Sequence, residues 1–275
     1  MGRSLWLINF LKRHFSMRFA VAELTKWPLI GPVMGHALFN GHKSGDTLFY
    51  LPKDRVVINQ QIDEQENIVV PSEVVSHFID EASYIFLMNH CVCREAADCQ
   101  EYDHDIGCIF LGEGVLDINP KLGRIVDKET ALAHLDKARQ AGLVHLIGRD
   151  KIDAVWMGVE ASTRLMTICN CCPCCCLFKF LPNLAPKLKN KVERMPGVVV
   201  SVTEDCIGCG SCMEENICFI NAISIVDGKA VISEECRGCG RCVEVCPTGA
   251  IHLDIEQDTY IDTAIERLSQ AVDVR

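Results

Sequence analysis

The sequence predicts an α+β protein, in which a mixed α/β, cysteine-rich N-terminal domain is followed by a smaller domain built from a duplicated unit. Three observations support this prediction. The chain has 275 residues, which allows about two domains with a real hydrophobic core. Helix-like and strand-like apolar patterns alternate through the first two thirds of the chain. Beyond residue 197, a cysteine-rich segment occurs twice at a spacing of 30 residues.

Cysteine dominates the composition, with 18 cysteines among 275 residues. Disulfides, zinc sites and iron–sulfur clusters are the three explanations to separate. Disulfides require a secreted chain, but Lys12, Arg13 and Arg18 interrupt the apolar residues that a signal peptide would need. No run of about 18 apolar residues suggests a membrane span either. We therefore expect a cytoplasmic protein whose cysteines bind metal.

The N-terminal segment, residues 1–45, is basic, with six Lys or Arg side chains against one acid. Within it, residues 5–26 predict an amphipathic helix, because apolar side chains recur at helical spacing. Two interpretations remain open for this helix. It lies at a membrane interface or on a partner subunit, which would make the protein membrane-peripheral, or it packs on its own domain. The rest of the chain is strongly acidic, which argues against nucleic acid as a partner and suits a basic redox partner protein.

Residues 46–181 predict the mixed α/β domain. Asp127 can cap a helix that Gly142 ends, and the run from Tyr84 to Met88 predicts a buried strand leading to Cys91. The further elements expected here are two short strands within 47–59 around a turn at Pro52–Asp54, a helix beginning at Pro71 and Ser72, and strands at Leu143–Ile147 and Asp153–Met157. Residues 182–197 are rich in proline and positive charge and predict a linker, and residues 256–275 predict a C-terminal helix.

The repeated unit lies within residues 198–255. Three cysteines at Cys-x2-Cys-x2-Cys spacing open each copy, and a further cysteine follows, which in the second copy precedes Pro247. Two zinc sites would need only separated pairs of cysteines. The region resembles the two-[4Fe-4S] bacterial-type ferredoxin family, and the resemblance implies crossed ligation of two [4Fe-4S] clusters. By that resemblance, one cluster takes Cys206, Cys209, Cys212 and Cys246, and the other takes Cys236, Cys239, Cys242 and Cys218.

The first copy departs from the ferredoxin pattern at one place. Five residues separate Cys212 from Cys218, and Phe219 stands where the family has proline. Because Ala222-Ile223 still aligns with Ala250-Ile251, we interpret the change as a two-residue insertion that keeps the ligand.

Ten further cysteines form two islands, both of which we assign to metal. The first island is Cys91, Cys93, Cys99 and Cys108. The second places six cysteines in eight residues: Cys169, Cys171, Cys172, Cys174, Cys175 and Cys176. If the second island is extended, Cys172, Cys174 and Cys176 share one side of the chain. Ten thiols suffice for one or two further clusters, and Arg94 can offset their negative charge.

The whole chain also resembles a group of uncharacterised archaeal and bacterial dicluster-ferredoxin proteins. The resemblance rests on a Cys-x-Cys-Arg element at Cys91–Arg94 and an Asn-Cys-Cys-Pro-Cys-Cys element at Asn170–Cys175. It implies an anaerobic source and redox work, but no substrate.

Three functions follow as hypotheses. The first is a multi-cluster electron-transfer protein, or a subunit of an oxidoreductase, that passes single electrons between a dicluster ferredoxin domain and N-terminal metal centres. The second is a reductase with a cysteine-rich iron–sulfur active site in the N-terminal domain. The third is a zinc-stabilised interaction module fused to a ferredoxin. No nucleotide-binding loop, flavin signature or hydrolytic triad is visible.

Overall fold

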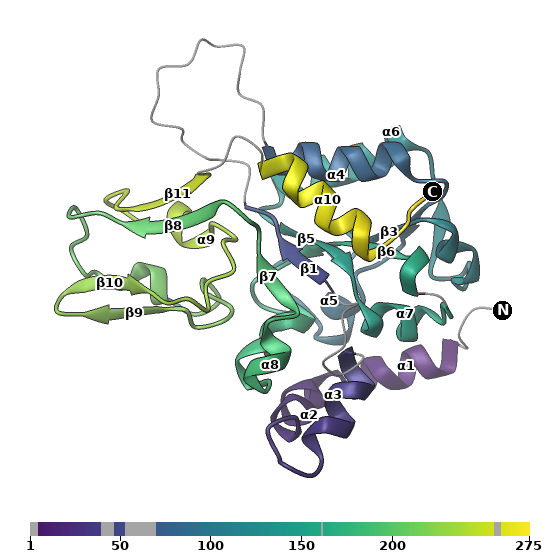
Figure 1. The fold of residues 1–275 in the computed structure, drawn as a ribbon, viewed down its shortest axis with the longest axis horizontal. Coiled ribbons are helices and arrows are strands. Elements are labelled where there is room, and N and C mark those ends of the chain that lie inside the picture. Colours follow the sequence, from purple (N-terminus) through teal and green to yellow (C-terminus); the bar gives the residue numbers. More distant parts are fainter. Residues whose placement is uncertain (1–4, 40–46, 53–69, 161, 256–259) are drawn as a thin grey trace.

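The computed structural model describes residues 5–39, 47–52, 70–160, 162–255 and 260–275. Figure 1 shows a larger N-terminal lobe around a central sheet and a smaller C-terminal lobe formed by residues 198–255. Mixed helices and sheets agree with the predicted α+β class.

The central sheet has seven strands in the order β4-β2-β3-β6-β5-β1-β7. Neighbouring strands are antiparallel except for β1 and β7, which run parallel. The strands are β1 Thr47–Tyr50, β2 Ile85–Met88, β3 Ile109–Leu111, β4 Gly123–Ile125, β5 Val144–Arg149, β6 Met166–Cys171 and β7 Val192–Arg194.

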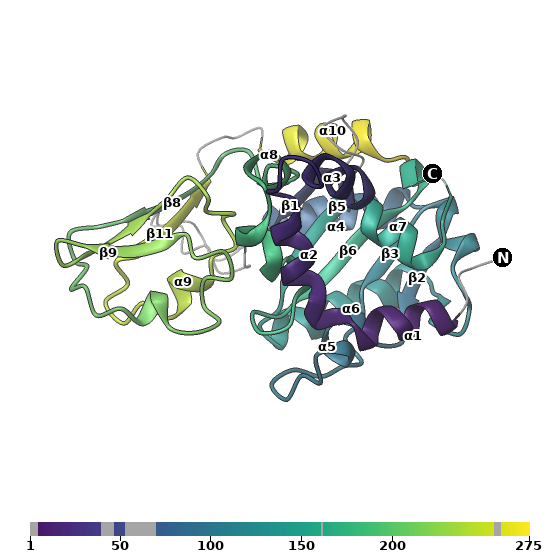
Figure 2. The ribbon, with the colours of Figure 1, turned by 90° about the horizontal axis from the view of Figure 1, so that it is seen from below.

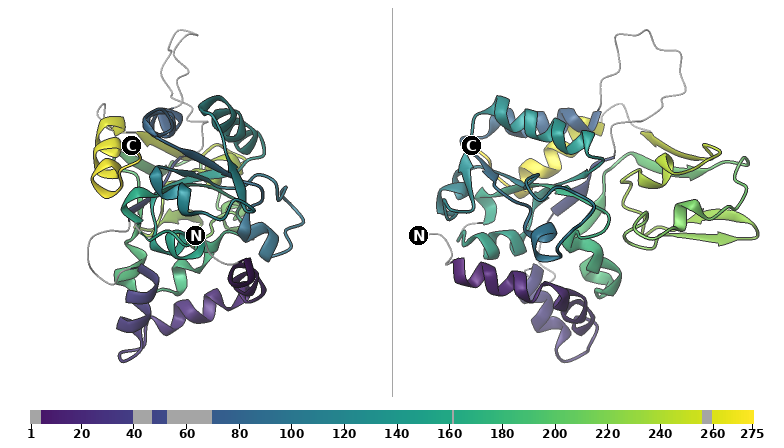
Figure 3. Two further views of the ribbon diagram at one scale, coloured as in Figure 1. Left: turned by 90° about the vertical axis from the view of Figure 1, so that its right-hand side faces the viewer. Right: turned by 180° about the vertical axis from the view of Figure 1, so that it is seen from behind.

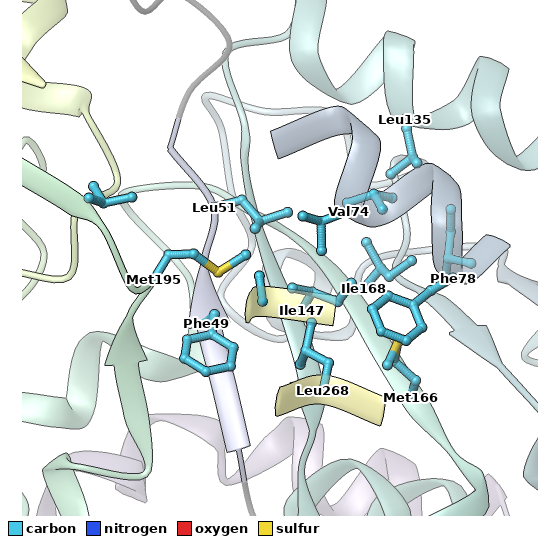
Figure 4. Packing of buried hydrophobic residues seen from close by; sticks show 14 of the residues in the cluster. Phe49, Leu51, Val74, Phe78, Leu135, Ile147, Met166, Ile168, Met195 and Leu268 are labelled. Atoms are coloured by element: carbon cyan, nitrogen blue, oxygen red, sulfur yellow. The ribbon is translucent and has the colours of Figure 1, made fainter. Parts of the chain in front are cut away.

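One face of this sheet is covered by three helices, α4 Val70–Glu81, α6 Lys128–Gln140 and α10 Tyr260–Ala271 (Figure 1). Strand alternation sends Phe49 of β1, and Leu51 directly after the strand, to this face, where Figure 4 shows them beside Met195 and Ile147. Leu268 of α10 joins the same core, so the C-terminal helix returns across the chain to close the N-terminal lobe.

The N-terminal helices and α7 cover the other face, as Figure 2 shows from below. This side contains α1 Leu5–Arg13, α2 Arg18–Leu24, α3 Gly31–Phe39 and α7 Lys151–Met157. Leu48 and Tyr50, the alternate residues of β1, pack here with Phe15 and Ala22. Cys171 and Cys176 lie on this side too, because they belong to the same hydrophobic cluster.

Shorter elements complete the N-terminal lobe. They are α5 Val92–Ala96, α8 Pro186–Lys189 and the 3-10 helices η1 Phe15–Met17, η2 Glu113–Asp117, η3 Ser162–Arg164 and η4 Leu177–Asn183.

The C-terminal lobe consists of two two-stranded antiparallel sheets with loops between them (Figure 3). Its elements are β8 Val198–Val202, η5 Ser211–Met213, β9 Ile223–Val226, β10 Lys229–Ile232, α9 Arg241–Glu244 and β11 Ile251–Ile255. β8 pairs with β11, and β9 pairs with β10.

Several sequence predictions are confirmed. The helix from residue 71 is α4, the strand at 84–88 is β2, and the strand at 143–147 is β5. The side chain of Asp127 accepts a hydrogen bond from the Thr130 N–H and caps α6, as predicted. The first strand expected within 47–59 is β1, whereas the second lies outside the described residues.

Three predictions need correction. The strand expected at Asp153–Met157 is helix α7, because Asp150 caps its start and Gly158, at φ +79°, ends it. The expected linker 182–197 instead contains α8 and the edge strand β7, and Leu184, Leu188 and Val192 are buried. The expected helix over residues 5–26 is divided at His14 into α1, η1 and α2.

Candidate metal centres

The C-terminal lobe brings four cysteines around a cavity near its outer end. We call this set, Cys206, Cys209, Cys212 and Cys246, the outer quartet. Three of its members come from the first sequence repeat and the fourth from the second.

A second cavity in the same lobe is lined by Cys218, Cys236, Cys239 and Cys242, which we call the inner quartet. The contributions are reversed here, because the second repeat supplies three cysteines and the first supplies one. Each cavity therefore combines both repeats, as crossed ligation would require.

Backbone geometry in this lobe suits two iron–sulfur clusters. Gly208 and Gly238 occupy equivalent positions of the two repeats, at φ +65° and +67°, where the left-handed backbone favours glycine. A Cβ at Gly208 would lie 2.3 Å from the Gly228 carbonyl oxygen. The N–H groups of Ala230 and Gly238 point at the Sγ atoms of Cys206 and Cys236, at 3.3 and 3.4 Å. Such N–H donors stabilise cysteine thiolates, and they also stabilise the sulfur atoms of a bound cluster.

The two quartets differ in exposure and in charge. In the outer quartet Cys209 is exposed, and the exposed acids Glu204, Asp205, Glu214 and Glu215 lie on its loops. In the inner quartet Cys242 is buried, and the buried arginines Arg237 and Arg241 line the cavity. Nearby positive charge stabilises a reduced, more negative cluster, so a cluster held by the inner quartet would be the more easily reduced of the two.

In the N-terminal lobe, seven cysteines line one cavity. We call six of them, Cys91, Cys93, Cys108, Cys169, Cys171 and Cys176, the six-thiol group; the seventh is Cys172. The Sγ atoms of Cys108 and Cys169 are 3.5 Å apart. Cys91 also contacts Cys93 and Cys108, and Cys171 contacts Cys169.

Hydrogen bonds within the six-thiol group prepare two of its members to bind metal as thiolates. Bonds from Cys108 and Cys93 lower the pKa of the Cys91 thiol well below its usual value. Bonds from Cys169 and Cys176 do the same for the pKa of Cys171. Because metals bind the thiolate, these shifts favour ligation by Cys91 and Cys171, whereas hydrogen bonds within the group and burial raise the pKa values of Cys93, Cys169 and Cys176.

Arg94 supplies a buried positive charge beside these thiols. Its side chain is fully buried, and Nη1 donates a 2.9 Å hydrogen bond to the Asn170 carbonyl oxygen. Burial opposes the charge of Arg94, but Cys91, Cys172 and Cys108 outweigh that effect and raise its pKa. The arginine therefore stays charged and offsets the negative charge of a thiolate site, as the sequence suggested.

Asp153 also lines this cavity, and burial raises the pKa of its carboxyl to about 6. The pKa of His145 is shifted downward instead, because burial and the charge of Arg139 lower it to about 4. His145 shares a 2.8 Å hydrogen bond with the Asn170 side chain, so this neutral histidine helps to fix the strand that carries Cys169 and Cys171.

The other cysteines of the N-terminal lobe, Cys99, Cys172, Cys174 and Cys175, form a four-thiol group that borders the first cavity through Cys172. Their Sγ atoms all lie within 4.8 Å of one another. The two islands of the sequence are thus each divided between two sites. The expectation that Cys172, Cys174 and Cys176 share one side is wrong, because Pro173–Cys175 form a turn instead of an extended segment.

Two contacts join the inner quartet to the six-thiol group. Arg241, between inner-quartet cysteines, donates a hydrogen bond of 2.5 Å to the carbonyl oxygen of Cys171. The Phe219 ring, next to Cys218, lies 4.7 Å from the Tyr50 ring, centroid to centroid. The Tyr50 hydroxyl lies 3.8 Å from the Cys176 Sγ.

Sequence reasoning missed the roles of Arg241 and Tyr50. The sequence holds a signal for Arg241, because the equivalent position of the first repeat is Ser211. Tyr50 lies 126 residues from Cys176, and no local pattern connects them.

Comparison with known proteins bears directly on the C-terminal lobe. The family described as 4Fe-4S binding domain matches residues 229–252, which contain the Cys236–Cys246 run. The chain is an iron–sulfur protein. That match and the clustered cysteines place it generally among iron–sulfur electron-transfer proteins.

An uncharacterized protein of Methanocaldococcus jannaschii is 33% identical to this iron–sulfur protein over 101 residues, which cover 34% of the chain and 24% of the relative. The match therefore spans about a quarter of the relative's length. No solved structure matches the chain. Within the described residues, none of the helices is long and apolar enough to cross a bilayer.

Proposed function

We propose that this protein passes single electrons between two [4Fe-4S] clusters in its C-terminal lobe and a further iron–sulfur centre in its N-terminal lobe. The outer and inner quartets would hold the two [4Fe-4S] clusters, and the six-thiol group would hold the N-terminal centre. Clusters bound in these places supply reversible one-electron oxidation and reduction.

The contact between the inner quartet and the six-thiol group carries this proposal. Phe219 and Tyr50 fill the space between Cys218 and Cys176 with packed aromatic rings. Arg241 ties the inner-quartet loop to Cys171 beside them. Both contacts are buried, so water is excluded where an electron would pass between the lobes.

The charge distribution favours transfer from the outer quartet inward. Exposed acids surround the outer quartet, whereas Arg237 and Arg241 lie beside the inner one. Electrons that enter at the outer quartet would therefore move toward the more easily reduced inner quartet.

The surface around the outer quartet suits a basic redox partner protein. Cys209 is exposed there, Ile207 is 67% exposed, and the acids of the same loops supply negative charge. Charge complementarity would steer a basic partner to this end of the molecule, and the exposed apolar side chain would be buried on contact.

The N-terminal helices offer a second surface. Trp6 is 72% exposed, Trp27 57% and Leu29 90%, while the exposed Arg13 adds positive charge. Such a surface fits peripheral contact with an anionic membrane or a partner subunit. The opposite side of these helices packs on the N-terminal lobe through Phe15 and Ala22.

One observation favours a reductase as the second candidate function. An apolar cavity of about 360 Å³ lies between the N-terminal helices and the α7–η4 region. Trp156 and Leu177 line both this cavity and the cavity of the six-thiol group. Arg18 lines it as well, and its buried Nε makes no hydrogen bond. The combination suits a small apolar substrate with an oxygen that accepts a hydrogen bond from arginine.

Filling the cavity tests the reductase alternative. Leu38→Trp would occupy the cavity, whereas Val33→Trp places the same side chain on the exposed side of the same helix, α3. If the cavity holds the substrate, reoxidation of dithionite-reduced protein by menadione should slow at least tenfold in the first variant only. Equal rates in both variants would exclude this cavity as the reaction site.

The electron-transfer proposal is tested by removing the outer cluster. In Cys209→Ser, reduction of the N-terminal centre by reduced methyl viologen, a cationic donor, should slow at least tenfold, because the entry site is lost. Reduction by dithionite, an anion that the acidic outer surface does not attract, should slow less. Freeze-quench electron paramagnetic resonance (EPR) follows both reactions. An unchanged rate with methyl viologen would contradict entry through the outer quartet.

A further inference from the structure

We propose that the four-thiol group holds a single zinc ion and stands outside the electron path. Its cysteines, Cys99, Cys172, Cys174 and Cys175, would bind this ion in a closed tetrahedral site that fixes the N-terminal lobe around its iron–sulfur centre.

The Sγ–Sγ distances in the four-thiol group match those expected around a single metal ion. A Zn–S bond is about 2.3 Å long, so tetrahedral geometry separates two ligand sulfurs by about 3.8 Å. The Sγ atoms of Cys99 and Cys174 are 3.5 Å apart, and all four Sγ atoms lie within 4.8 Å of one another.

A four-iron cluster requires a wider arrangement. Each thiolate binds a different iron at the outside of the cluster, so the sulfurs stand further apart than around one ion. The outer quartet, the inner quartet and the six-thiol group all lie within the described residues. No three thiols of any of these sets lie mutually within 4.8 Å. The six-thiol group contains close pairs, such as Cys108 and Cys169 at 3.5 Å, but only the four-thiol group, among these described sets, has all its thiols close enough to surround one ion.

The site is closed, as structural zinc sites are. Cys99, Cys172 and Cys175 are buried, and Ile106 and Leu143 pack against them. Four thiolates fill all four positions of a tetrahedral ion and leave none for a substrate or a water molecule.

Two groups offset the double negative charge of zinc with four thiolates. The positive charge of Arg94, which is fully buried, acts on Cys172. The Cys175 N–H donates a hydrogen bond to the Cys172 Sγ at 3.3 Å. Both interactions strengthen metal binding by stabilising thiolate over thiol.

The position of the site indicates what the ion does. It joins the loop that begins with Cys99 to the turn at Pro173–Cys175, and that turn is flanked by Cys171 and Cys176 of the six-thiol group. The same loop contacts Cys91, whose N–H donates to the His104 carbonyl oxygen at 2.7 Å. A zinc ion here would hold both segments that supply the six-thiol group at a fixed separation.

X-ray absorption at the zinc edge tests the proposal on the unaltered, anaerobically purified protein. We expect one zinc per chain, with four sulfur neighbours at about 2.3 Å and no metal neighbour. Absence of zinc, or a zinc ion with fewer than three sulfur neighbours, would overturn the proposal.

A pair of variants identifies the ligands. Cys174→Ala should lose at least nine tenths of the zinc and keep the iron of the C-terminal lobe, whereas Cys209→Ala should lose iron and keep zinc. Loss of about four irons and their sulfide from Cys174→Ala, with no zinc involved, would show a cluster at this site instead.

Cys99→His covers the case in which Cys174→Ala does not fold. Zinc accepts imidazole, so this variant should retain the ion with one nitrogen in place of one sulfur. A zinc ion that keeps four sulfur neighbours in this variant would contradict ligation by Cys99. Iron counted on the same samples tests the proposed function independently of the zinc proposal. About eight irons would contradict the electron-transfer function, whatever the zinc content.

Discussion

The guanidinium of Arg241 donates a hydrogen bond of 2.5 Å to the carbonyl oxygen of Cys171, and so joins the C-terminal lobe to strand β6 of the N-terminal lobe. Both ends of this bond are buried. One side chain therefore acts on two centres, because it lies between inner-quartet cysteines and reaches the six-thiol group.

Replacing Arg241 should affect both centres. In Arg241→Met, loss of the positive charge should lower the midpoint potential of the inner cluster, and loss of the buried bond should lower the free energy of unfolding by about 1.5–3 kcal/mol. Redox titration and denaturation measure these effects.

Arg237→Met is the matched control. Arg237 is also buried beside the inner quartet, but it bonds to the Lys189 carbonyl oxygen instead of Cys171. It should lower the same potential and leave the spectrum of the N-terminal centre unchanged. Identical changes of that spectrum in both variants would show that the Cys171 bond has no separate role.

Crossed ligation is tested at Cys246, which lines the outer cavity although its neighbours in sequence belong to the inner quartet. Cys246→Ala should remove the EPR signal of the outer cluster and keep that of the inner one, and Cys218→Ala should do the reverse. Loss of the inner signal in Cys246→Ala would mean that each repeat supplies all four ligands of its own cluster.

Gly208 and Gly210, which lie between outer-quartet cysteines, allow backbone strain and steric conflict to be measured separately. Gly210 has φ +82° and open space around its Cα, so Gly210→Ala should cost only the left-handed backbone energy of about 1–2 kcal/mol. Gly208→Ala adds a clash with the Gly228 carbonyl oxygen and should greatly reduce iron occupancy of the outer quartet. Iron analysis and thermal unfolding distinguish the two, and equal occupancy would contradict the clash.

Deletion of residues 1–27 should lower the iron content of the N-terminal lobe. The sequence alone left open whether residues 5–26 pack on their own domain. Phe15 and Ala22, however, share a hydrophobic cluster with Cys171 and Cys176, and Lys12 pairs with Glu95 of α5 at 2.5 Å. Iron analysis after deletion measures the loss, while the C-terminal clusters should remain.

Substitutions on the exposed side of these helices test membrane contact separately. Replacing Trp6, Trp27 and Leu29 by serine should abolish flotation with anionic vesicles and leave the iron content unchanged, because these side chains are exposed. High salt should weaken flotation of the unaltered protein, since each basic residue adds about 1 kcal/mol of attraction. Full-length protein that does not float at any salt concentration would exclude the membrane and leave a partner subunit.

Local patterns predicted much of the fold. The Asp127 cap and the apolar spacing behind it determine α6 within a single segment, and the run before Cys91 forms β2. The strand expected at Asp153–Met157 failed because a short apolar run fits strand and helix alike, and the caps at Asp150 and Gly158 decided the outcome.

The candidate sites were predictable where ligands are close in sequence. In the C-terminal lobe, the Cys-x2-Cys-x2-Cys spacing of each repeat predicts that its three cysteines share a site. The sequence does not predict how the ten N-terminal cysteines are divided between two sites. Cys108 meets Cys169 because β3 pairs with β6, and a turn directs Cys175 and Cys176 to different sites. Strand pairing between distant segments has no local signature. The same holds for Tyr50, which reaches Cys176 only after β1 has joined the sheet.

The most direct test of the central claim is a reductive titration of anaerobically purified, full-length protein, followed by EPR and Mössbauer spectroscopy after iron and sulfide have been counted. We predict about 12 iron atoms in three clusters, with electrons added one at a time appearing at the inner cluster and at a third, N-terminal centre. About eight iron atoms, with every added electron confined to the two clusters of the C-terminal lobe, would contradict the proposed function.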